Sequence, residues 1–120
     1  MSKKILICDD EVGIRESLKL ILGDEFSLIA VEDSQQCLDC LMNSSKNIGL
    51  VLLDIKMPKV NGLDVLTQIK KHRSEVPVIM VTGYKAVGTA TEATDRGASG
   101  YITKPFKSED ILEAARKFMK

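Results

Sequence analysis

Short runs of apolar residues alternate along the chain with longer stretches in which apolar positions recur at the spacing of a helix. The apolar runs predict five strands, at residues 4–8, 26–31, 48–53, 76–81 and 101–103. The periodic stretches between and after them predict five helices. The fourth, at residues 85–97, is predicted to be weak because it contains Gly88 and three threonines, which are poor helix formers.

This alternation of strand and helix predicts an α/β fold. Strands that are apolar throughout are typical of a parallel sheet covered by helices on both faces. Right-handed crossovers leave few topologies, and we predict a doubly wound five-stranded sheet in the order 2-1-3-4-5. With 120 residues, the chain is expected to form a single domain, residues 1–120.

Composition and charge exclude several functions. Seventeen basic and seventeen acidic side chains cancel, so there is no electrostatic case for binding nucleic acid or a membrane surface. No apolar run is long enough to span a bilayer, and the run at residues 5–8 is too short for a signal peptide. An odd number of cysteines, three, is more typical of the reducing cytoplasm than of a disulfide scaffold. We therefore expect a cytoplasmic domain.

Chemically active side chains follow the predicted strands at their carboxyl ends. Asp9 and Asp10 follow the first strand, Asp54 the third, Thr82 the fourth and Lys104 the fifth. The first and third strands flank the point where the winding of the sheet reverses, which is where ligands bind in such folds. The three aspartates are thus expected to converge and to need a positive partner, which Lys104 and a divalent cation would supply. With no histidine or cysteine nearby, an all-oxygen ligand set favours Mg²⁺.

These groups favour phosphoryl transfer as the chemistry. A carboxylate next to a cation and an ammonium can act as the nucleophile, and an aspartyl phosphate is an established kind of covalent intermediate. The only histidine, His72, lies in a basic run at the end of a predicted helix. We interpret that run as an exposed helix terminus favoured by the helix dipole.

With these features, the chain resembles the receiver domains of response regulators in two-component signalling. Four motifs in order carry the resemblance: Asp9-Asp10, the segment LDIKMPKVNG at residues 53–62, Thr82-Gly83, and Lys104-Pro105-Phe106. The Asp-x-x-Met-Pro-x-x-x-Gly pattern in the second motif is specific, whereas the acidic pair or the Lys-Pro pair alone would be weak. The resemblance covers nearly all of the 120 residues and implies a flavodoxin/CheY-like fold.

The resemblance implies a phosphoacceptor role with a bound Mg²⁺. Asp54 would take a phosphoryl group from the phosphohistidine of a histidine kinase, and Lys104 would contact the phosphate. Asp10 would bind Mg²⁺ directly and Asp9 mainly through water. Asp54 and the backbone carbonyl of Lys56 would complete the protein ligands.

A conformational switch is also implied by the resemblance. Thr82 would contact the phosphate, and Thr82 and Tyr101 would be the switch residues; plain packing is the rival interpretation of Tyr101. The Lys104–Pro105 peptide bond would be cis. Lys56 and Tyr84, both bulky, occupy positions that tune phosphate lifetime in the family.

The resemblance implies partners as well. A sensor histidine kinase or a phosphotransfer protein would supply the phosphoryl group. The surface around the fourth helix, fifth strand and fifth helix would then control an output domain or a target protein. A homodimer that forms on phosphorylation is also allowed, and the chain can be either a stand-alone regulator or the first part of a longer one. The segments at residues 82–84 and 103–106 further resemble NtrC-type transcriptional activators.

Three rival functions fit the sequence less well. A haloacid-dehalogenase-type phosphatase requires a second acidic residue two positions after the nucleophile, where this chain has Lys56. A nucleotide- or flavin-binding module needs a glycine-rich loop after the first strand, where the acidic residues 9–11 would repel phosphate. A pseudo-receiver that only binds partners does not need the complete acidic site. We therefore expect a signalling phosphoacceptor rather than an enzyme acting on other molecules.

The pair Cys37-x-x-Cys40 resembles a redox or metal motif only superficially. It falls inside a predicted helix rather than at the N-terminus of one, and no second pair completes a zinc site. We interpret these thiols, and that of Cys8 in the first strand, as small hydrophobic groups in the core.

Overall fold

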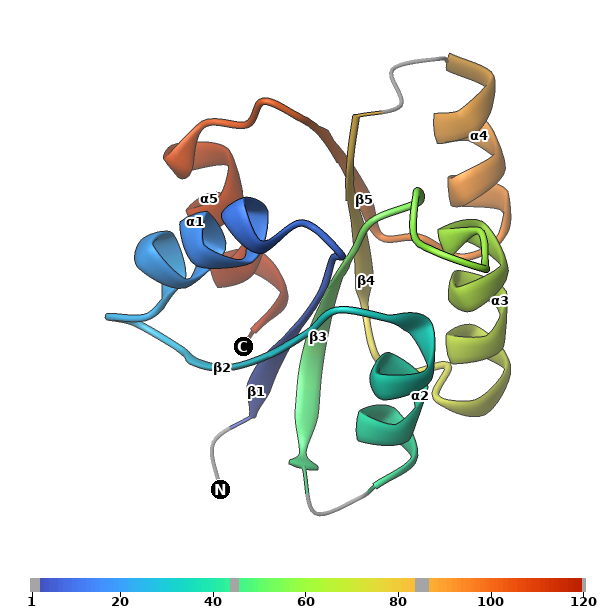
Figure 1. The fold of residues 1–120 in the computed structure, drawn as a ribbon, viewed down its shortest axis with the longest axis horizontal. Coiled ribbons are helices and arrows are strands. Elements are labelled where there is room, and N and C mark those ends of the chain that lie inside the picture. Colours follow the sequence, from blue (N-terminus) through green and yellow to red (C-terminus); the bar gives the residue numbers. More distant parts are fainter. Residues whose placement is uncertain (1–2, 44–45, 84–86, 120) are drawn as a thin grey trace.

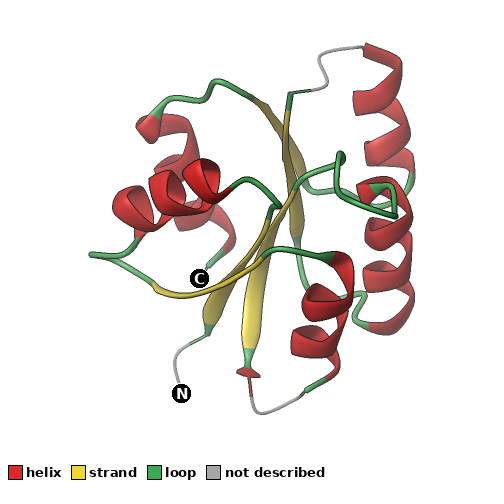
Figure 2. Cartoon of the chain, viewed as in Figure 1, coloured by secondary structure: helices red, strands yellow, loops and turns green. Residues whose placement is uncertain are grey.

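The computed structural model describes residues 3–43, 46–83 and 87–119. Strands and helices alternate along the chain, as the hydrophobic pattern predicts (Figure 2). The strands are β1 (Lys4–Cys8), β2 (Ser27–Val31), β3 (Ile48–Leu53), β4 (Val78–Thr82) and β5 (Gly100–Thr103). The helices are α1 (Val12–Leu22), α2 (Ser34–Met42), α3 (Gly62–His72), α4 (Val87–Asp95) and α5 (Ser108–Phe118).

The strands form one parallel sheet in the order β2-β1-β3-β4-β5, which confirms the predicted topology. Helices α1 and α5 lie on one face of the sheet, and α2, α3 and α4 lie on the other (Figure 1). The winding direction reverses between β1 and β3, which are hydrogen-bonded neighbours. The carboxyl ends of these two strands therefore meet at the reversal point.

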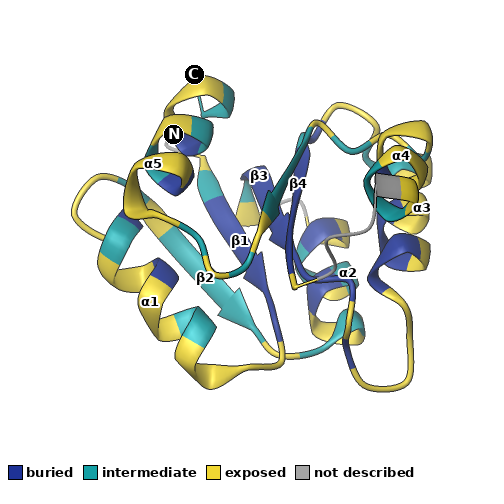
Figure 3. Ribbon diagram, turned by 90° about the horizontal axis from the view of Figure 1, so that it is seen from above, coloured by how far each residue is buried: buried dark blue, intermediate teal, exposed yellow. Residues whose placement is uncertain are grey.

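The core consists of two hydrophobic clusters, one on each face of the sheet. Side chains of α2, α3 and α4 pack on one face, and side chains of α1 and α5 pack on the other. All six residues of β3 are buried, because this strand lies at the centre of the sheet and is covered from both sides. Figure 3 shows the same contrast, with β1, β3 and β4 mostly buried and β2 only partly buried. The central strands thus hold the residues that follow them in fixed positions.

Three strands differ from their predicted bounds, the fifth only in that it begins at Gly100, one residue earlier than expected. We expected the second strand to include Phe26, but the Phe26 N–H donates to the Leu22 carbonyl at 2.9 Å and so does not join the sheet ladder. We expected the fourth strand at residues 76–81, but it begins at Val78, after Pro77, and includes Thr82. Proline has no N–H to donate, which favours a strand start after it.

Side-chain caps fix the start of two helices. Asp33 accepts a hydrogen bond from the Gln36 N–H at 2.8 Å and caps α2. Asn61 caps α3 in the same way, through the Leu63 N–H at 2.8 Å. None of the described helices has the length and apolar character that crossing a membrane requires.

The cysteines are core residues in this fold. Cys8 and Cys37 are fully buried in the cluster under α2 and α3, and Cys40 packs partly buried against it. Met57, in the loop after β3, is buried in the same cluster, with its Sδ 3.7 Å from the Cys8 Sγ. The thioether therefore anchors this loop to the core.

Candidate functional site

The predicted site residues follow the strands at one edge of the sheet, and backbone hydrogen bonds extend the ladder to hold them there. The Asp9 N–H donates to Val31 at 3.2 Å, and the Asp54 N–H donates to Cys8 at 3.1 Å. The Lys104 N–H donates to the carbonyl of Thr82 at 2.8 Å. Residues far apart in sequence are thus brought to one place by the regular sheet.

The ammonium group of Lys104 is the centre of the site. Its Nζ lies 2.9 Å from Asp9 Oδ2, 3.1 Å from Asp54 Oδ2 and 3.1 Å from Glu11 Oε1. The Lys104 side chain is only 13% exposed, and those of Asp9 and Asp54 are 3% exposed. The peptide bond from Lys104 to Pro105 is cis. A positive charge is therefore held between buried carboxylates on two neighbouring strands.

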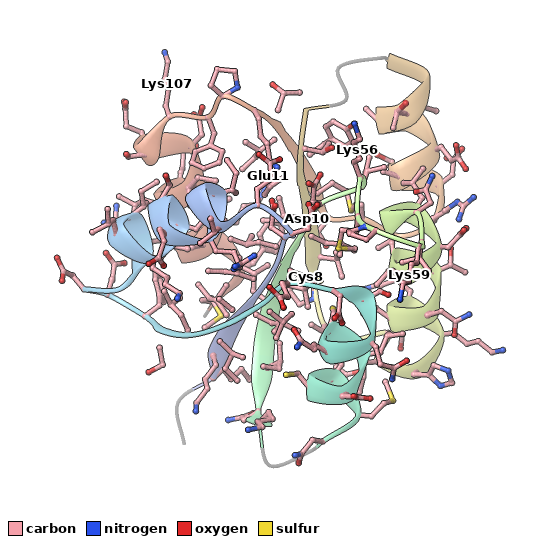
Figure 4. The ribbon with its side chains drawn as sticks, viewed as in Figure 1. Cys8, Asp10, Glu11, Lys56, Lys59 and Lys107 are labelled. Carbon is pink, nitrogen blue, oxygen red and sulfur yellow. The ribbon has the colours of Figure 1, made fainter. Side chains whose placement is uncertain are left out.

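Four acidic side chains gather around this lysine. Oxygen atoms of Asp9, Asp10, Glu11 and Asp54 lie within 4.8 Å of one another, close enough to hold one cation between them. Asp10 and Glu11 are exposed, whereas the other two are buried. Figure 4 shows Asp10, Glu11 and Lys56 gathered where the central strands end. All the available ligand atoms are oxygens, so the site fits Mg²⁺ better than a soft metal.

The charges in this site do not cancel. Burial raises the pKa of Asp9 above its usual range, although the Glu11 N–H and the Lys104 ammonium act in the opposite direction. Burial alone would lower the pKa of Lys104, but its contacts with Asp9 and Asp54 raise that pKa well above the usual value. Lys104 therefore stays protonated, and the carboxylates together still carry more charge than it neutralises.

An open pocket of about 290 Å³ adjoins Asp54. Its lining residues are Glu11, Asp54, Lys56, Thr82, Gly83 and Lys104. The Lys56 N–H points to Asp54 Oδ1 at a long 3.4 Å, and the Lys56 side chain is exposed at the pocket rim. The expected role of the Lys56 carbonyl as a metal ligand stays a prediction. The pocket is thus lined by a carboxylate, a hydroxyl and an ammonium group.

The loop after β3 holds Asp54 by close packing. Gly62, the first residue of α3, donates its N–H to the Ile55 carbonyl at 2.6 Å. A Cβ at position 62 would overlap the backbone carbonyl of Asp54 and lie 2.6 Å from the Ile55 Cα. The glycine at the end of the LDIKMPKVNG segment is therefore required by the approach of the α3 backbone to the end of β3.

The expected switch residues flank the same region. Thr82 is fully buried at the end of β4 and lines the pocket. Tyr101 lies half-buried on β5, paired with Met80, and packs against the core cluster on the α3 and α4 face. Burial raises the pKa of Tyr101, and the charge of Asp54 adds to that effect. Tyr84, expected to tune phosphate lifetime, lies outside the described residues.

Sequence reasoning missed two residues of the site. Glu11 binds Lys104 through its side chain, and its N–H donates to Asp9 Oδ1 at 2.9 Å. Arg15 donates from its guanidinium to the Asp9 carbonyl at 2.8 Å. The position of Glu11 directly after the acidic pair was a signal that could have found it. Nothing in the sequence pattern singles out Arg15.

His72 does not belong to the site. It is exposed at the end of α3 and does not line the pocket next to Asp54, in keeping with its interpretation as a helix terminus. Cys37 and Cys40 also lie away from the pocket, on α2.

Sequence comparison links this chain to a known family. Residues 5–116 match the family model of the response regulator receiver domain. The response regulator MprA of Mycobacterium sp. (strain KMS) is 31% identical over 121 residues, which cover 100% of this chain and 52% of that protein. The chain thus spans about half the length of this curated relative.

Solved structures agree with the sequence comparison. A CheY-like receiver domain protein from Methanospirillum hungatei JF-1 superposes with a TM-score of 0.90 at 32% identity, covering 98% of this chain and 93% of that one. The receiver domain of NtrX from Brucella abortus gives a TM-score of 0.88 at 34% identity, covering 97% and 98%. The fold and the family expected from the sequence are confirmed.

Proposed function

Because the chain belongs to the response regulator receiver domain family, we propose that it is a phosphoacceptor that carries a phosphoryl group on Asp54. The observation that carries this proposal is the contact of the Lys104 ammonium with Asp54 at 3.1 Å and with Asp9 at 2.9 Å beside an open pocket. The donor would be the phosphohistidine of a sensor histidine kinase or of a phosphotransfer protein.

The reaction is one in-line displacement at phosphorus. A carboxylate oxygen of Asp54 forms the new P–O bond while the P–N bond to the donor histidine breaks, and the electron pair leaves with the imidazole nitrogen. Lys104 offsets the charge on the phosphoryl oxygens. The chemistry of the domain itself is then limited to gaining and losing this group.

Mg²⁺ is the cofactor that the site fits best. Asp9, Asp10 and Asp54, with the Lys56 backbone carbonyl, would hold it; the cluster of carboxylate oxygens supports this choice. The bound ion would neutralise charge on the phosphoryl group and on the carboxylates. The excess of carboxylates over ammonium groups at the site is the physical reason to expect that phosphorylation depends on a divalent cation.

The signal would leave the site through Thr82 and Tyr101. The Thr82 hydroxyl would move to the new phosphoryl oxygens, and Tyr101 would turn toward the space that it vacates. Thr82 pairs with Thr103 of β5, and Tyr101 lies on β5, the strand that contacts α4. A second open cavity of about 570 Å³ runs along β5 and α5, which makes this face suitable for contact with an output domain, a target protein or a second copy.

We propose a cytoplasmic setting for this function, where kinases and their phosphodonors are found. The chain spans 52% of MprA. The signal would be used either by an output domain on the same protein, outside these residues, or by a separate target protein.

The proposal is tested by incubating the protein with acetyl phosphate or phosphoramidate and weighing it. We expect the wild type to gain the mass of one phosphoryl group in Mg²⁺ and to gain nothing in EDTA. Asp54→Asn, checked for folding, should gain nothing in either condition. A folded Asp54→Asn protein that is modified as fast as wild type would overturn the assignment.

A further inference from the structure

All the hydrogen-bonding capacity of the Lys104 ammonium is already used. An ammonium has three N–H donors, and Lys104 has three carboxylate partners: Asp9 at 2.9 Å, Asp54 at 3.1 Å and Glu11 at 3.1 Å. A phosphoryl oxygen can bind Lys104 only if one of these partners leaves. The identity of the partner that leaves decides how the site accommodates the new group.

Two of the three partners are held in place. Asp9 is 3% exposed, and its second oxygen accepts the Glu11 N–H at 2.9 Å. Asp54 is also 3% exposed, and with Oδ1 as the oxygen that forms the P–O bond, its Oδ2 keeps the contact with Lys104. The Glu11 side chain, by contrast, is 59% exposed. Exposed ion pairs contribute little to stability, so this contact is the one broken at the smallest cost.

Glu11 also faces the space that the phosphoryl group must enter. It lines the same pocket as Asp54, Thr82 and Lys104, whereas Asp9 does not line that pocket. We infer that Glu11 is a placeholder anion: its carboxylate occupies on Lys104 the position that a phosphoryl oxygen takes, and phosphorylation displaces it into solvent. This inference rests on the proposed function and assigns Glu11 as a positioning residue for it.

The placeholder competes with the phosphoryl group, and two substitutions separate this competition from a general charge effect. Glu11→Gln removes the charge. Glu11→Asp keeps the negative charge beside the pocket, but its side chain is shorter by one C–C bond. Its carboxylate therefore lies about 1.5 Å farther from Lys104. Lys104 cannot follow, because Asp9 and Asp54 hold it. If phosphorylation requires that Glu11 leave Lys104, both variants should therefore show the same increase in phosphorylation rate.

The experiment measures the initial rate of phosphorylation by acetyl phosphate and the affinity for beryllofluoride as a phosphoryl mimic. Each variant is assayed at its own saturating Mg²⁺, determined by a separate titration. We expect Glu11→Gln and Glu11→Asp to react about 1.5-fold to fivefold faster than wild type and to bind beryllofluoride tighter by a similar factor, which corresponds to the energy of an exposed ion pair. Glu16→Gln is the matched control, since Glu16 is an exposed residue of α1 paired with Lys19, and it should behave as wild type.

A second readout follows Glu11 itself. In wild-type protein, the carboxyl carbon signal of Glu11 in NMR spectra should shift to the position of an unpaired glutamate when beryllofluoride binds. A signal that does not move would contradict displacement.

The outcomes separate this inference from the function on which it rests. If wild type is not phosphorylated, both fail. If wild type is phosphorylated and Glu11→Asp reacts at the wild-type rate, a negative charge at residue 11 alone accounts for the slower reaction of wild type. The inference that Glu11 occupies the phosphoryl position on Lys104 is then wrong. If both variants react at the wild-type rate or slower, Glu11 does not compete for Lys104 and the inference also fails, while the proposed function stands.

Discussion

Asp9 carries its charge in a poorly hydrated position. Its side chain is 3% exposed, and burial raises its pKa above the usual value of 3.8. The folded state therefore binds more protons than the unfolded state between the usual and the raised pKa. It follows that the contribution of Asp9 to stability falls as the pH rises through this window and stays low above it.

We predict that Asp9→Asn is more stable than wild type near pH 7 in EDTA. The gain should exceed about 0.5 kcal/mol, the usual limit for an exposed substitution, and should vanish as the pH falls below the usual aspartate pKa. Urea unfolding at several pH values measures it. Asp24→Asn, at an exposed position, is the control and should change nothing. A gain for Asp9→Asn that does not depend on pH would contradict the explanation by charge burial.

A second residue-scale prediction concerns Gly62. Because an added Cβ would overlap the Asp54 backbone, Gly62→Ala should cost about 1–3 kcal/mol of stability and slow phosphorylation. Gly13→Ala is the matched control: its Cβ would meet nothing within 4 Å in α1, so it should stabilise by up to about 1 kcal/mol. Unfolding and phosphorylation assays on both variants check this. Equal effects of the two substitutions would refute the steric argument.

The site shows where prediction from residue patterns ends. Asp9, Asp54 and Lys104 could be placed because the carboxyl ends of parallel strands share one edge. The contacts of Glu11 and Arg15 depend on how side chains turn at the start of α1, which spacing alone does not determine. The sequence therefore predicts which strand-end residues lie close together, and the structure adds which carboxylates contact the Lys104 ammonium.

At the scale of elements, α4 is held to the fold mainly at its C-terminal end. Ala93 is the only fully buried side chain among those described in this helix. Arg96 ties the helix to α3 by donating to Asp64 at 2.9 Å and to Thr67 at 3.3 Å, and it also binds Glu92 at 2.6 Å. With little buried apolar area and poor helix formers, α4 is expected to open at low cost.

We predict that Arg96→Ala loosens α4 locally. Hydrogen exchange at residues 88–95 should become faster, whereas global stability should fall by no more than about 1 kcal/mol because the ion pairs are exposed. Arg116→Ala is the control, since Arg116 forms a similar exposed pair with Glu25 at 2.8 Å on the opposite face of the sheet. That variant should leave exchange in α4 unchanged. Unchanged exchange in Arg96→Ala would show that Arg96 does not hold the helix.

The elements themselves were largely predictable, and the exceptions have local causes. The strand order follows from apolar strands and right-handed crossovers, and it is the observed order. The bounds of β2 and β4 differ by one or two residues because a helix carbonyl captures the Phe26 N–H and because Pro77 cannot donate. Such local hydrogen bonds leave no trace in hydrophobic periodicity.

At the scale of the whole molecule, the site lies at the carboxyl ends of the strands, and the two faces of the sheet are covered by different helices. Helices α1 and α5 cover one face, and α2, α3 and α4 cover the other (Figure 1). β5 lies at the edge of the sheet, between the buried centre and the cavity along α5. A change at Asp54 therefore has a short path to an exposed surface through Thr82 and β5, which is what the proposed signalling role needs.

The most direct test of the account is chemical trapping of the phosphorylated residue. Borodeuteride reduces an aspartyl phosphate to homoserine with loss of phosphate, so the modified position can be found in a peptide map. After treatment with acetyl phosphate and Mg²⁺, the account predicts deuterated homoserine at position 54 and an unmodified aspartate at positions 9 and 10. Homoserine at either of those positions, or its absence from position 54 in protein that has gained a phosphoryl group, would contradict it.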